Sequence, residues 1–156
     1  MNTLILYATK HGAARGIAQR IADDMGGAVL HDLKQAGPPA LAQFDCVIVG
    51  SSLYAGMIRK EAKAYLAQNA DALREKRLGL FLCGMDASRE KEYFEANVPP
   101  ALVQQAMAAA FLGGIFDPKK AGAMGRLVMK AVAKQSGYAD TIDGGKIKRF
   151  AKEMGA

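Results

Sequence analysis

The sequence predicts an α/β fold, a single domain of 156 residues built on a doubly wound, five-stranded parallel sheet. Two observations predict it. Apolar, β-prone runs alternate along the chain with stretches of helical spacing. Glycine or proline marks most of the boundaries between these segments. Regular alternation of strands and helices over a chain of this length is typical of one domain with helices on both faces of a parallel sheet.

The first half of the chain contains three predicted strands and one helix. A β-prone apolar run near the start predicts the first strand, and apolar pairs at helical spacing predict the helix that follows it. Two glycines end this helix, and a Gly-Pro-Pro segment separates the second strand from the third. The predicted elements are the strand Thr3–Ala8, the helix Ala13–Met25, the strand Ala28–His31 and the buried strand Asp45–Gly50.

The second half continues the alternation of helices and strands up to the end of the chain. One helical stretch is interrupted by two consecutive prolines, because proline cannot continue a helix. The predicted elements are the helix Arg59–Ala70, the strand Leu78–Cys83, a helical stretch between Arg89 and Met107 broken at Pro99-Pro100, the fifth strand Ala109–Phe116 and the helix Gly145–Met154.

The irregular element is the segment 117–144, between the fifth strand and the last helix. A connection of this length is expected to have structure or function of its own. It contains a predicted amphipathic helix, Ala123–Lys134, which either packs on the domain or lies on a membrane surface. Leu127, Val128, Ala131 and Val132 are expected on one side of this helix, and Arg126, Lys130 and Lys134 on another.

Positive charge is concentrated in the last quarter of the chain. Residues 1–117 contain 12 Lys and Arg and 12 Asp and Glu, whereas residues 118–156 contain 9 and 3, which accounts for the net charge of +6. This segment is either a solvated basic face or a surface that docks on an acidic protein, an anionic membrane or a polyanion. We expect no nucleic-acid partner.

Composition predicts a soluble protein of the cytoplasm. Cys46 and Cys83 lie in apolar runs and are expected to be reduced core residues rather than a disulfide. No apolar run approaches the roughly 18 residues that cross a bilayer. The chain enters its first strand without a preceding signal segment. Peripheral contact with the inner face of the membrane, through Arg126, Lys130 and Lys134, is the alternative that the basic segment leaves open.

Several classes of functional site are excluded because the sequence lacks their motifs. The segment Gly50–Tyr54 lacks the second glycine of a nucleophile elbow, and Gly145-Lys146 is followed by isoleucine rather than Ser or Thr as in a Walker loop. The loop Gly12–Gly16 does not match the dinucleotide fingerprint. With His11 and His31 as the only histidines and no Cys/His pair at zinc spacing, no metal site is expected.

Three loops remain at the edge where the strands end, which is where ligands bind in open parallel sheets. The first, Thr9–Ala14, combines a hydroxyl, a cation and a helix N-terminus, which suits a phosphate. The second, Ser51–Gly56, has small residues around Tyr54, which suits a flat ring. The third is Gly84–Arg89. A phosphate at one end and an aromatic ring at the other is the outline of a mononucleotide, and FMN fits best.

The segment Thr9–Gly12 between a strand and a helix, together with Val47–Gly56 and Leu80–Gly84, resembles the flavodoxin family. The resemblance covers nearly the whole chain. It is greatest to the branch that includes the menaquinone-dependent protoporphyrinogen oxidases. Those proteins also carry extra residues between the last strand and the last helix, with a basic and apolar stretch similar to Arg126–Lys130.

The resemblance implies a sheet of strand order 2-1-3-4-5 and a noncovalently bound FMN. It places the first loop around the phosphate, the second beside the isoalloxazine with Tyr54 against a ring face, and the third over the other edge of the ring. The residues that it implies as cofactor-binding are Thr9, Lys10, His11, Gly12, Ala13, Ala14, Ser51, Ser52, Leu53, Tyr54, Ala55, Gly56, Cys83, Gly84, Met85, Asp86 and Ser88.

The first loop departs from the family pattern, which holds several Ser and Thr hydroxyls around the phosphate. Only Thr9 remains here, and each lost hydrogen bond to a charged group forgoes about 1.5–3 kcal/mol. Backbone amides remain, and Lys10, His11 or Arg15 can compensate; otherwise FMN binds weakly or another ligand has replaced it. The positions without a hydroxyl are Ala8, His11, Ala13 and Ala14.

Three functions follow from this resemblance and its departures. The first is an FMN-dependent redox protein that carries electrons between a reductant and a protein or quinone acceptor. The second is a protoporphyrinogen oxidase-like enzyme that passes electrons to a membrane quinone, with segment 117–144 in contact with substrate or membrane. The third is a binding module that has lost FMN and uses its basic helix.

Overall fold

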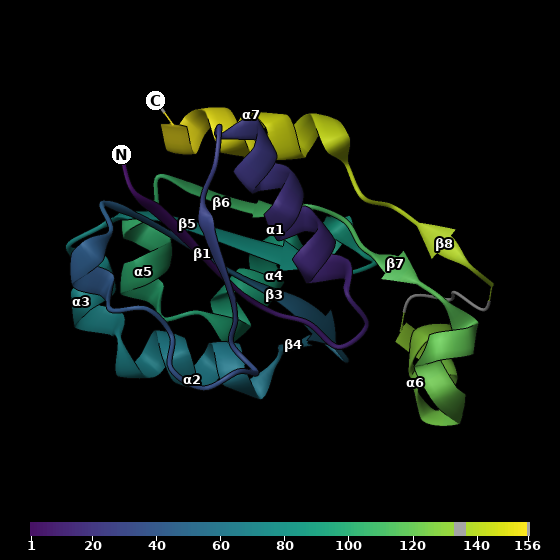
Figure 1. Cartoon of the computed structure of the whole chain (residues 1–156). Coiled ribbons are helices and arrows are strands. Elements are labelled where there is room, and N and C mark those ends of the chain that lie inside the picture. Colours follow the sequence, from purple (N-terminus) through teal and green to yellow (C-terminus); the bar gives the residue numbers. More distant parts are fainter. Residues whose placement is uncertain (133–136, 156) are drawn as a thin grey trace.

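The computed structural model describes residues 1–132 and 137–155, and it contains a twisted parallel sheet with helices on both faces (Figure 1). The order of the five parallel strands is β2-β1-β3-β5-β6. This is the order 2-1-3-4-5 when the five predicted strands are counted along the chain, so the predicted fold class is confirmed. The strands are β1 (Thr3–Ala8), β2 (Val29–Asp32), β3 (Cys46–Tyr54), β5 (Arg77–Cys83) and β6 (Ala108–Phe111).

Two layers of helices enclose the sheet (Figure 1). One face is covered by α1 (Ala13–Asp24) and α7 (Gly144–Gly155), which pack against each other. The other face carries four helices that follow β4 and β5 in the chain, with short 3₁₀ turns at Leu41–Gln43 and Ala87–Arg89. These four are α2 (Lys60–Gln68), α3 (Ala70–Arg74), α4 (Glu90–Asn97) and α5 (Pro100–Gln105).

The alternation of side chains along each strand produces two separate cores. In β1, Leu4 and Leu6 belong to the core beneath α2–α5, whereas Ile5 and Tyr7 belong to the core beneath α1 and α7. Both faces of the strand are apolar because both are covered, as is usual in parallel sheets. This explains why the sequence runs of the central strands are almost continuously hydrophobic.

A glycine in the middle of the sheet makes room for a phenylalanine ring of the second core. Gly50 in β3 lies beside Phe81 in β5, and a Cβ at Gly50 would fall on the Phe81 ring. Phe81 packs edge-on against Phe150 of α7, with ring centroids 6.3 Å apart. The missing side chain therefore lets one ring join β3, β5 and α7.

The second predicted loop is a β-hairpin, which corrects the assignment of Ser51–Gly56. Strand β3 continues through Tyr54 and pairs in antiparallel fashion with β4 (Met57–Ile58). The turn is formed by Ala55 and Gly56, whose φ angles are 51° and 79°. Positive φ at both turn positions is the type I′ geometry that fits the twist of a hairpin.

The predicted fifth strand Ala109–Phe116 is wrong as one element. It divides into β6 and a second strand, β7 (Ile115–Phe116), which pairs with β8 (Ala139–Asp140) outside the main sheet. Gly113 has φ of 87°, and a Cβ there would collide with the carbonyl of Thr141. The chain therefore leaves the main sheet at a position that only glycine fits.

The predicted start of the helix in the irregular segment, Ala123, follows a break at Gly122 that separates it from a short helical turn. Helix α6 (Pro118–Val132) starts after Asp117, whose carboxylate accepts the N–H of Lys119, and Gly122 interrupts it with φ of 67°. The predicted end at Lys134 lies outside the described residues. In Figure 1, α6 stands at the end of the molecule where the parallel strands end, opposite the two chain termini. No helix in the described part of the chain has the length and apolar character to cross a bilayer.

Candidate functional site: a cavity at the carboxyl edge of the sheet

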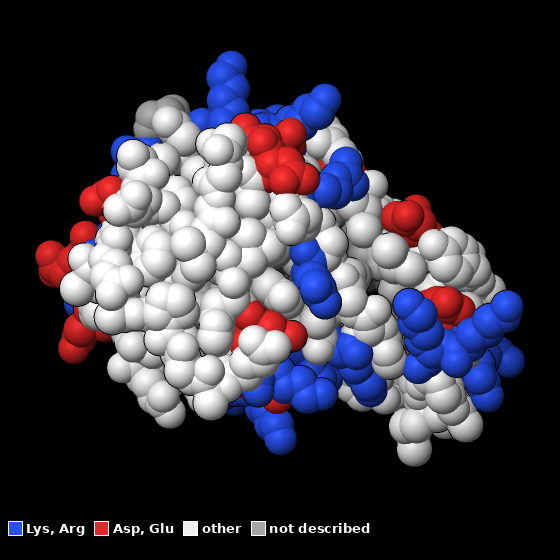
Figure 2. Space-filling view, viewed as in Figure 1, with Lys and Arg blue, Asp and Glu red and all other residues white. Residues whose placement is uncertain are grey.

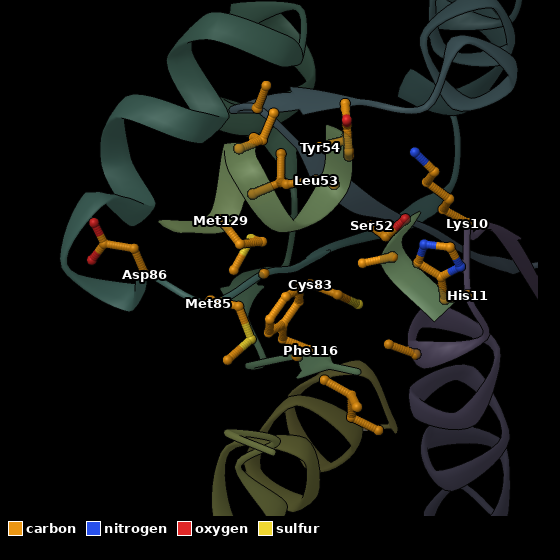
Figure 3. A pocket seen from close by; sticks show the side chains of 18 of the residues that line it. Lys10, His11, Ser52, Leu53, Tyr54, Cys83, Met85, Asp86, Phe116 and Met129 are labelled. Atoms are coloured by element: carbon orange, nitrogen blue, oxygen red, sulfur yellow. The ribbon is translucent and has the colours of Figure 1, made fainter. Parts of the chain in front are cut away.

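One cavity opens where β1, β3 and β5 end, and α6 covers its far side (Figure 3). The predicted loops and the irregular segment all contribute to it. All but four of the predicted site residues line it. The lining residues are Thr9, Lys10, His11, Ala13, Ser52, Leu53, Tyr54, Ala55, Gly56, Cys83, Gly84, Met85, Asp86, Tyr93, Gly114, Ile115, Phe116, Ala121, Gly125, Val128 and Met129.

The cavity has a polar end and an apolar middle. In Figure 3, Lys10, His11 and Ser52 gather on one side, and Asp86 lies on the opposite side. The space between them is lined by sulfur atoms and apolar carbon. The labelled side chains of this middle part are Cys83, Met85, Phe116 and Met129.

The polar end is organised by the first loop and the start of α1. The Thr9 hydroxyl accepts the N–H of Gly12 at 2.8 Å, and Gly12 has φ of 103°, which glycine adopts without strain. This turn starts α1 beside the cavity. The first N–H groups of a helix have no partner within the helix and carry partial positive charge, so they favour an anion here.

Ser52 lines the cavity, and its hydroxyl is unsatisfied. Its oxygen is buried and, within residues 1–132 and 137–155, lacks a hydrogen-bond partner. The neighbouring Ser51 differs, because its hydroxyl donates to the carbonyl of Ser52 and accepts the N–H of Arg59, both at 2.9 Å. An unpaired buried hydroxyl costs about 1–3 kcal/mol. A polar ligand atom would recover that cost once the side chain turned its hydroxyl toward the cavity.

Tyr54 already has a partner on one of its ring faces. The ammonium of Lys10 lies 3.7 Å from the centroid of the Tyr54 ring, a cation–π contact. A flat ligand would therefore meet the other face of Tyr54, or Lys10 would move toward the ligand. The predicted stacking of Tyr54 on a ring stays a prediction.

The charges of three cations from different parts of the chain act on His11. Burial lowers the pKa of His11, and the charges of Lys10, Lys120 and Arg59 lower it further, against an opposing effect of Asp117. Lys120 belongs to α6, and Arg59 immediately precedes α2. Because like charges repel, such a cluster is stabilised by a bound anion. Cations thus stand where the sequence lacks hydroxyls.

A buried amide holds the hairpin that carries Tyr54. The Asn97 side chain of α4 donates to the carbonyls of Gly56 and Tyr93, each at 2.8 Å, and accepts the N–H of Ile58 at 3.0 Å. Asn97 is buried, so water does not replace these bonds. One side chain therefore satisfies the backbone of the turn and fixes it to α4.

We expect Asn97→Leu to destabilise the protein by about 2–4 kcal/mol, because it leaves the Ile58 N–H and the Gly56 carbonyl buried without partners. Urea unfolding followed by circular dichroism measures the effect. Asn69→Ala is the control, since that half-buried side chain makes one bond, to the carbonyl of Tyr65. Equal losses for the two variants would contradict the role of Asn97.

The third loop contributes a carboxylate and a buried thiol. Asp86 lines the cavity and accepts both the hydroxyl and the N–H of Ser88, which start the turn that leads to α4. Burial raises the pKa of the Cys83 thiol, so it stays protonated and unreactive. Both cysteines are free and buried, as predicted.

Four predicted site residues do not line the cavity, and each has another role. Ser51 and Ser88 make the hydrogen bonds described above, Gly12 forms the turn before α1, and Ala14 is fully buried in the core beneath α1. No three-residue group of His, Cys, Asp and Glu among the described residues is arranged to hold a metal ion.

The far wall of the cavity was not among the residues that the sequence assigned to the cofactor site. Helix α6 contributes Val128 and Met129, and Phe116 precedes it. The amphipathic pattern of α6 predicted an apolar face but not what the face covers. It also grouped Leu127 with Val128, whereas Leu127 is 62% exposed. The lining residues that were missed are Tyr93, Gly114, Ile115, Phe116, Ala121, Gly125, Val128 and Met129.

Comparison with solved structures shows the same fold in several flavoproteins. Flavodoxin 2 from Bacillus cereus is 18% identical with a TM-score of 0.62, and the alignment covers 99% of this chain and 97% of that one. A flavodoxin from the domain Archaea is 11% identical with a TM-score of 0.58, covering 99% and 96%. Rubredoxin oxygen:oxidoreductase from Desulfovibrio gigas is 14% identical with a TM-score of 0.60. This chain is covered to 99% in that match but spans only 35% of the oxidoreductase.

Sequence comparison identifies the family. A search of curated proteins gave no match. A model of the flavodoxin domain matches residues 4–143, which include the sheet, all three predicted loops and α6. The chain therefore belongs to the flavodoxin domain family.

Proposed function

We propose that the chain binds FMN noncovalently in this cavity and carries electrons between a reductant and a protein or quinone acceptor. The buried hydroxyl of Ser52 is the observation that carries the proposal, because Ser52 lines the cavity and its hydroxyl lacks a partner among the described residues. It lies between a cationic end and an apolar middle (Figure 3). A ligand with an anionic phosphate and a flat, mostly apolar ring has the matching chemistry.

Each part of the cavity would contact a different part of FMN. The first-turn amides of α1, with Lys10, Arg59 and Lys120, would hold the phosphate. Apolar side chains such as Phe116 and Met129 would exclude water from the ring. Bound FMN supplies electron-transfer chemistry, which belongs to the cofactor. The surrounding cations favour added negative charge and therefore favour acceptance of electrons.

The absorption spectrum of the purified protein, followed by titration with FMN, tests this function. We expect flavin bands and saturable binding. A colourless protein that does not bind added FMN would contradict the proposal. It would favour the alternative of a binding module that has lost its cofactor.

His11 provides a second test that does not require redox activity. We expect its ring pKa in the free protein to lie below 6.5 and to rise when inorganic phosphate or FMN binds, because an anion offsets the three cations. Since a lowered histidine pKa means that the unfolded chain binds more protons, the unfolding free energy should fall as pH drops below about 6.5. Proton NMR resolves His11, with His31 outside the cavity as the control. An unchanged His11 titration at saturating FMN would place the phosphate elsewhere.

A protoporphyrinogen oxidase-like activity that delivers electrons to a membrane quinone is the second candidate. The apolar wall that α6 adds to the cavity favours it, because Phe116, Val128 and Met129 form a surface suited to a flat apolar molecule. Oxidation of protoporphyrinogen by the FMN-loaded protein, with a quinone as acceptor, tests it. FMN binding without this turnover would leave the electron carrier as the function.

A further inference from the structure

The outer side of α6 carries apolar side chains that nothing in the described structure covers. Met124 is 67% exposed and Leu127 is 62% exposed, although both are large and hydrophobic. They lie three residues apart and therefore on the same side of the helix. An adjoining side of the same helix lines the cavity through Gly125, Val128 and Met129.

Four cations flank these apolar side chains. Helix α6 contains Lys119, Lys120, Arg126 and Lys130 and no acidic residue. All four are exposed. Figure 2 shows Lys and Arg concentrated at this end of the molecule, with uncharged atoms protruding beyond them. We define the α6 outer surface as Met124, Leu127, Lys119, Arg126 and Lys130, because Lys120 acts on His11.

We propose that the α6 outer surface docks on an anionic lipid bilayer, with Met124 and Leu127 among the acyl chains and the cations at the headgroups. Apolar side chains bordered by Lys and Arg on one helix are the pattern of interfacial helices. A protein interface is a poorer match, because two protruding side chains on one helix are small for a stable interface, which buries about 1,200–2,000 Å². Anionic headgroups instead attract each cation independently.

The position of α6 gives this docking a consequence for the cavity. The helix has the bilayer-facing stripe and the cavity-lining stripe on adjoining sides, since Leu127 and Val128 are consecutive. A molecule dissolved in the bilayer would therefore reach the cavity wall without crossing bulk water. This consequence rests on the proposed function, whereas the docking itself does not require FMN.

Co-sedimentation with vesicles tests the docking. We expect the full chain to sediment with vesicles of phosphatidylglycerol and phosphatidylcholine in equal amounts, and not with phosphatidylcholine alone. Lys119→Glu with Lys130→Glu should lower the bound fraction about tenfold or more, because two attractions become repulsions. Met124→Ser with Leu127→Ser should lower it as well, since the apolar anchor is lost.

A matched charge change elsewhere separates docking from nonspecific attraction. Lys148→Glu with Lys152→Glu alters the net charge equally on α7, where both side chains are exposed, and should leave binding unchanged. Equal loss in both charge variants, full binding of the serine variant, or no binding of the wild type would each overturn the proposal. So would a dimer in light scattering that the serine variant abolishes, since a second copy would then cover the surface.

The same variants are titrated with FMN, so that the two proposals fail separately. Retained FMN affinity with lost vesicle binding supports docking through α6 in a folded protein. Vesicle binding by a wild type that ignores FMN would leave the docking intact and contradict the proposed cofactor.

Discussion

Gly50→Ala should destabilise the protein by about 3 kcal/mol or more, the largest effect that we expect from adding one methyl group. The new Cβ would fall on the ring of Phe81, which is 1% exposed and in contact with Phe150. Interiors are packed too densely for the ring to move aside without opening other contacts. Because domains are stable by only about 5–15 kcal/mol, a large part of the stability would be lost. Urea unfolding measures the change.

Two further variants control this experiment. Gly16→Ala adds the same methyl group to an exposed position of α1 where a Cβ would meet nothing within 4 Å, so it should stabilise by about 0.5–1 kcal/mol. Phe81→Leu removes the ring and should make Gly50→Ala less costly than it is in the wild type. Strictly additive effects of Gly50→Ala and Phe81→Leu would contradict the packing explanation.

Arg59→Ala combined with Lys120→Ala should weaken FMN binding about 100-fold, because each cation is expected to contribute at least 1.5 kcal/mol to holding the phosphate. Riboflavin has the same ring without the phosphate, so its affinity should change little. Both dissociation constants are measured by quenching of flavin fluorescence. Higher salt should reduce the difference between FMN and riboflavin in the wild type, since it screens exposed charges.

Neighbouring lysines provide the controls for this prediction. Lys63→Ala and Lys119→Ala remove charges from α2 and α6 at exposed positions that are not among the cations lowering the pKa of His11. They should leave the affinity for FMN nearly unchanged. If the double variant loses FMN and riboflavin affinity equally, the cations do not act on the phosphate. If the double variant keeps its affinity for both FMN and riboflavin, the backbone amides alone hold the phosphate.

The best-predicted elements are those whose burial is visible as a run of apolar residues in the sequence. Strand β1 was predicted with its observed bounds, and β5 to within one residue, because both of their faces are apolar. The two-residue strands β7 and β8 were not predicted. They pair residues 115 and 140, and such distant pairing leaves no periodic pattern in a short segment.

The residues of the candidate site also fall into those that the sequence indicated and those that it did not. Thr9, Ser52 and Met85 were found because each follows or ends a recognisable strand, and parallel strands end at one edge. No local signal marked Arg59 and Lys120, whose charges lower the pKa of His11, or Asn97 beneath the hairpin. Their positions depend on how α2, α4 and α6 pack.

The sequence by itself determined the parallel sheet, its two apolar faces and the edge at which a ligand would bind. The alternation of strands with helices and the burial of their faces both produce periodic patterns in short stretches of sequence. Only the tertiary structure decided that α6 covers the cavity, that the charges of Arg59 and Lys120 act on His11, and that the hydroxyl of Ser52, unlike that of Ser51, lacks a partner among the described residues. Those features arise from contacts between residues far apart in the chain. The packing of whole elements creates them, and no short segment contains that information.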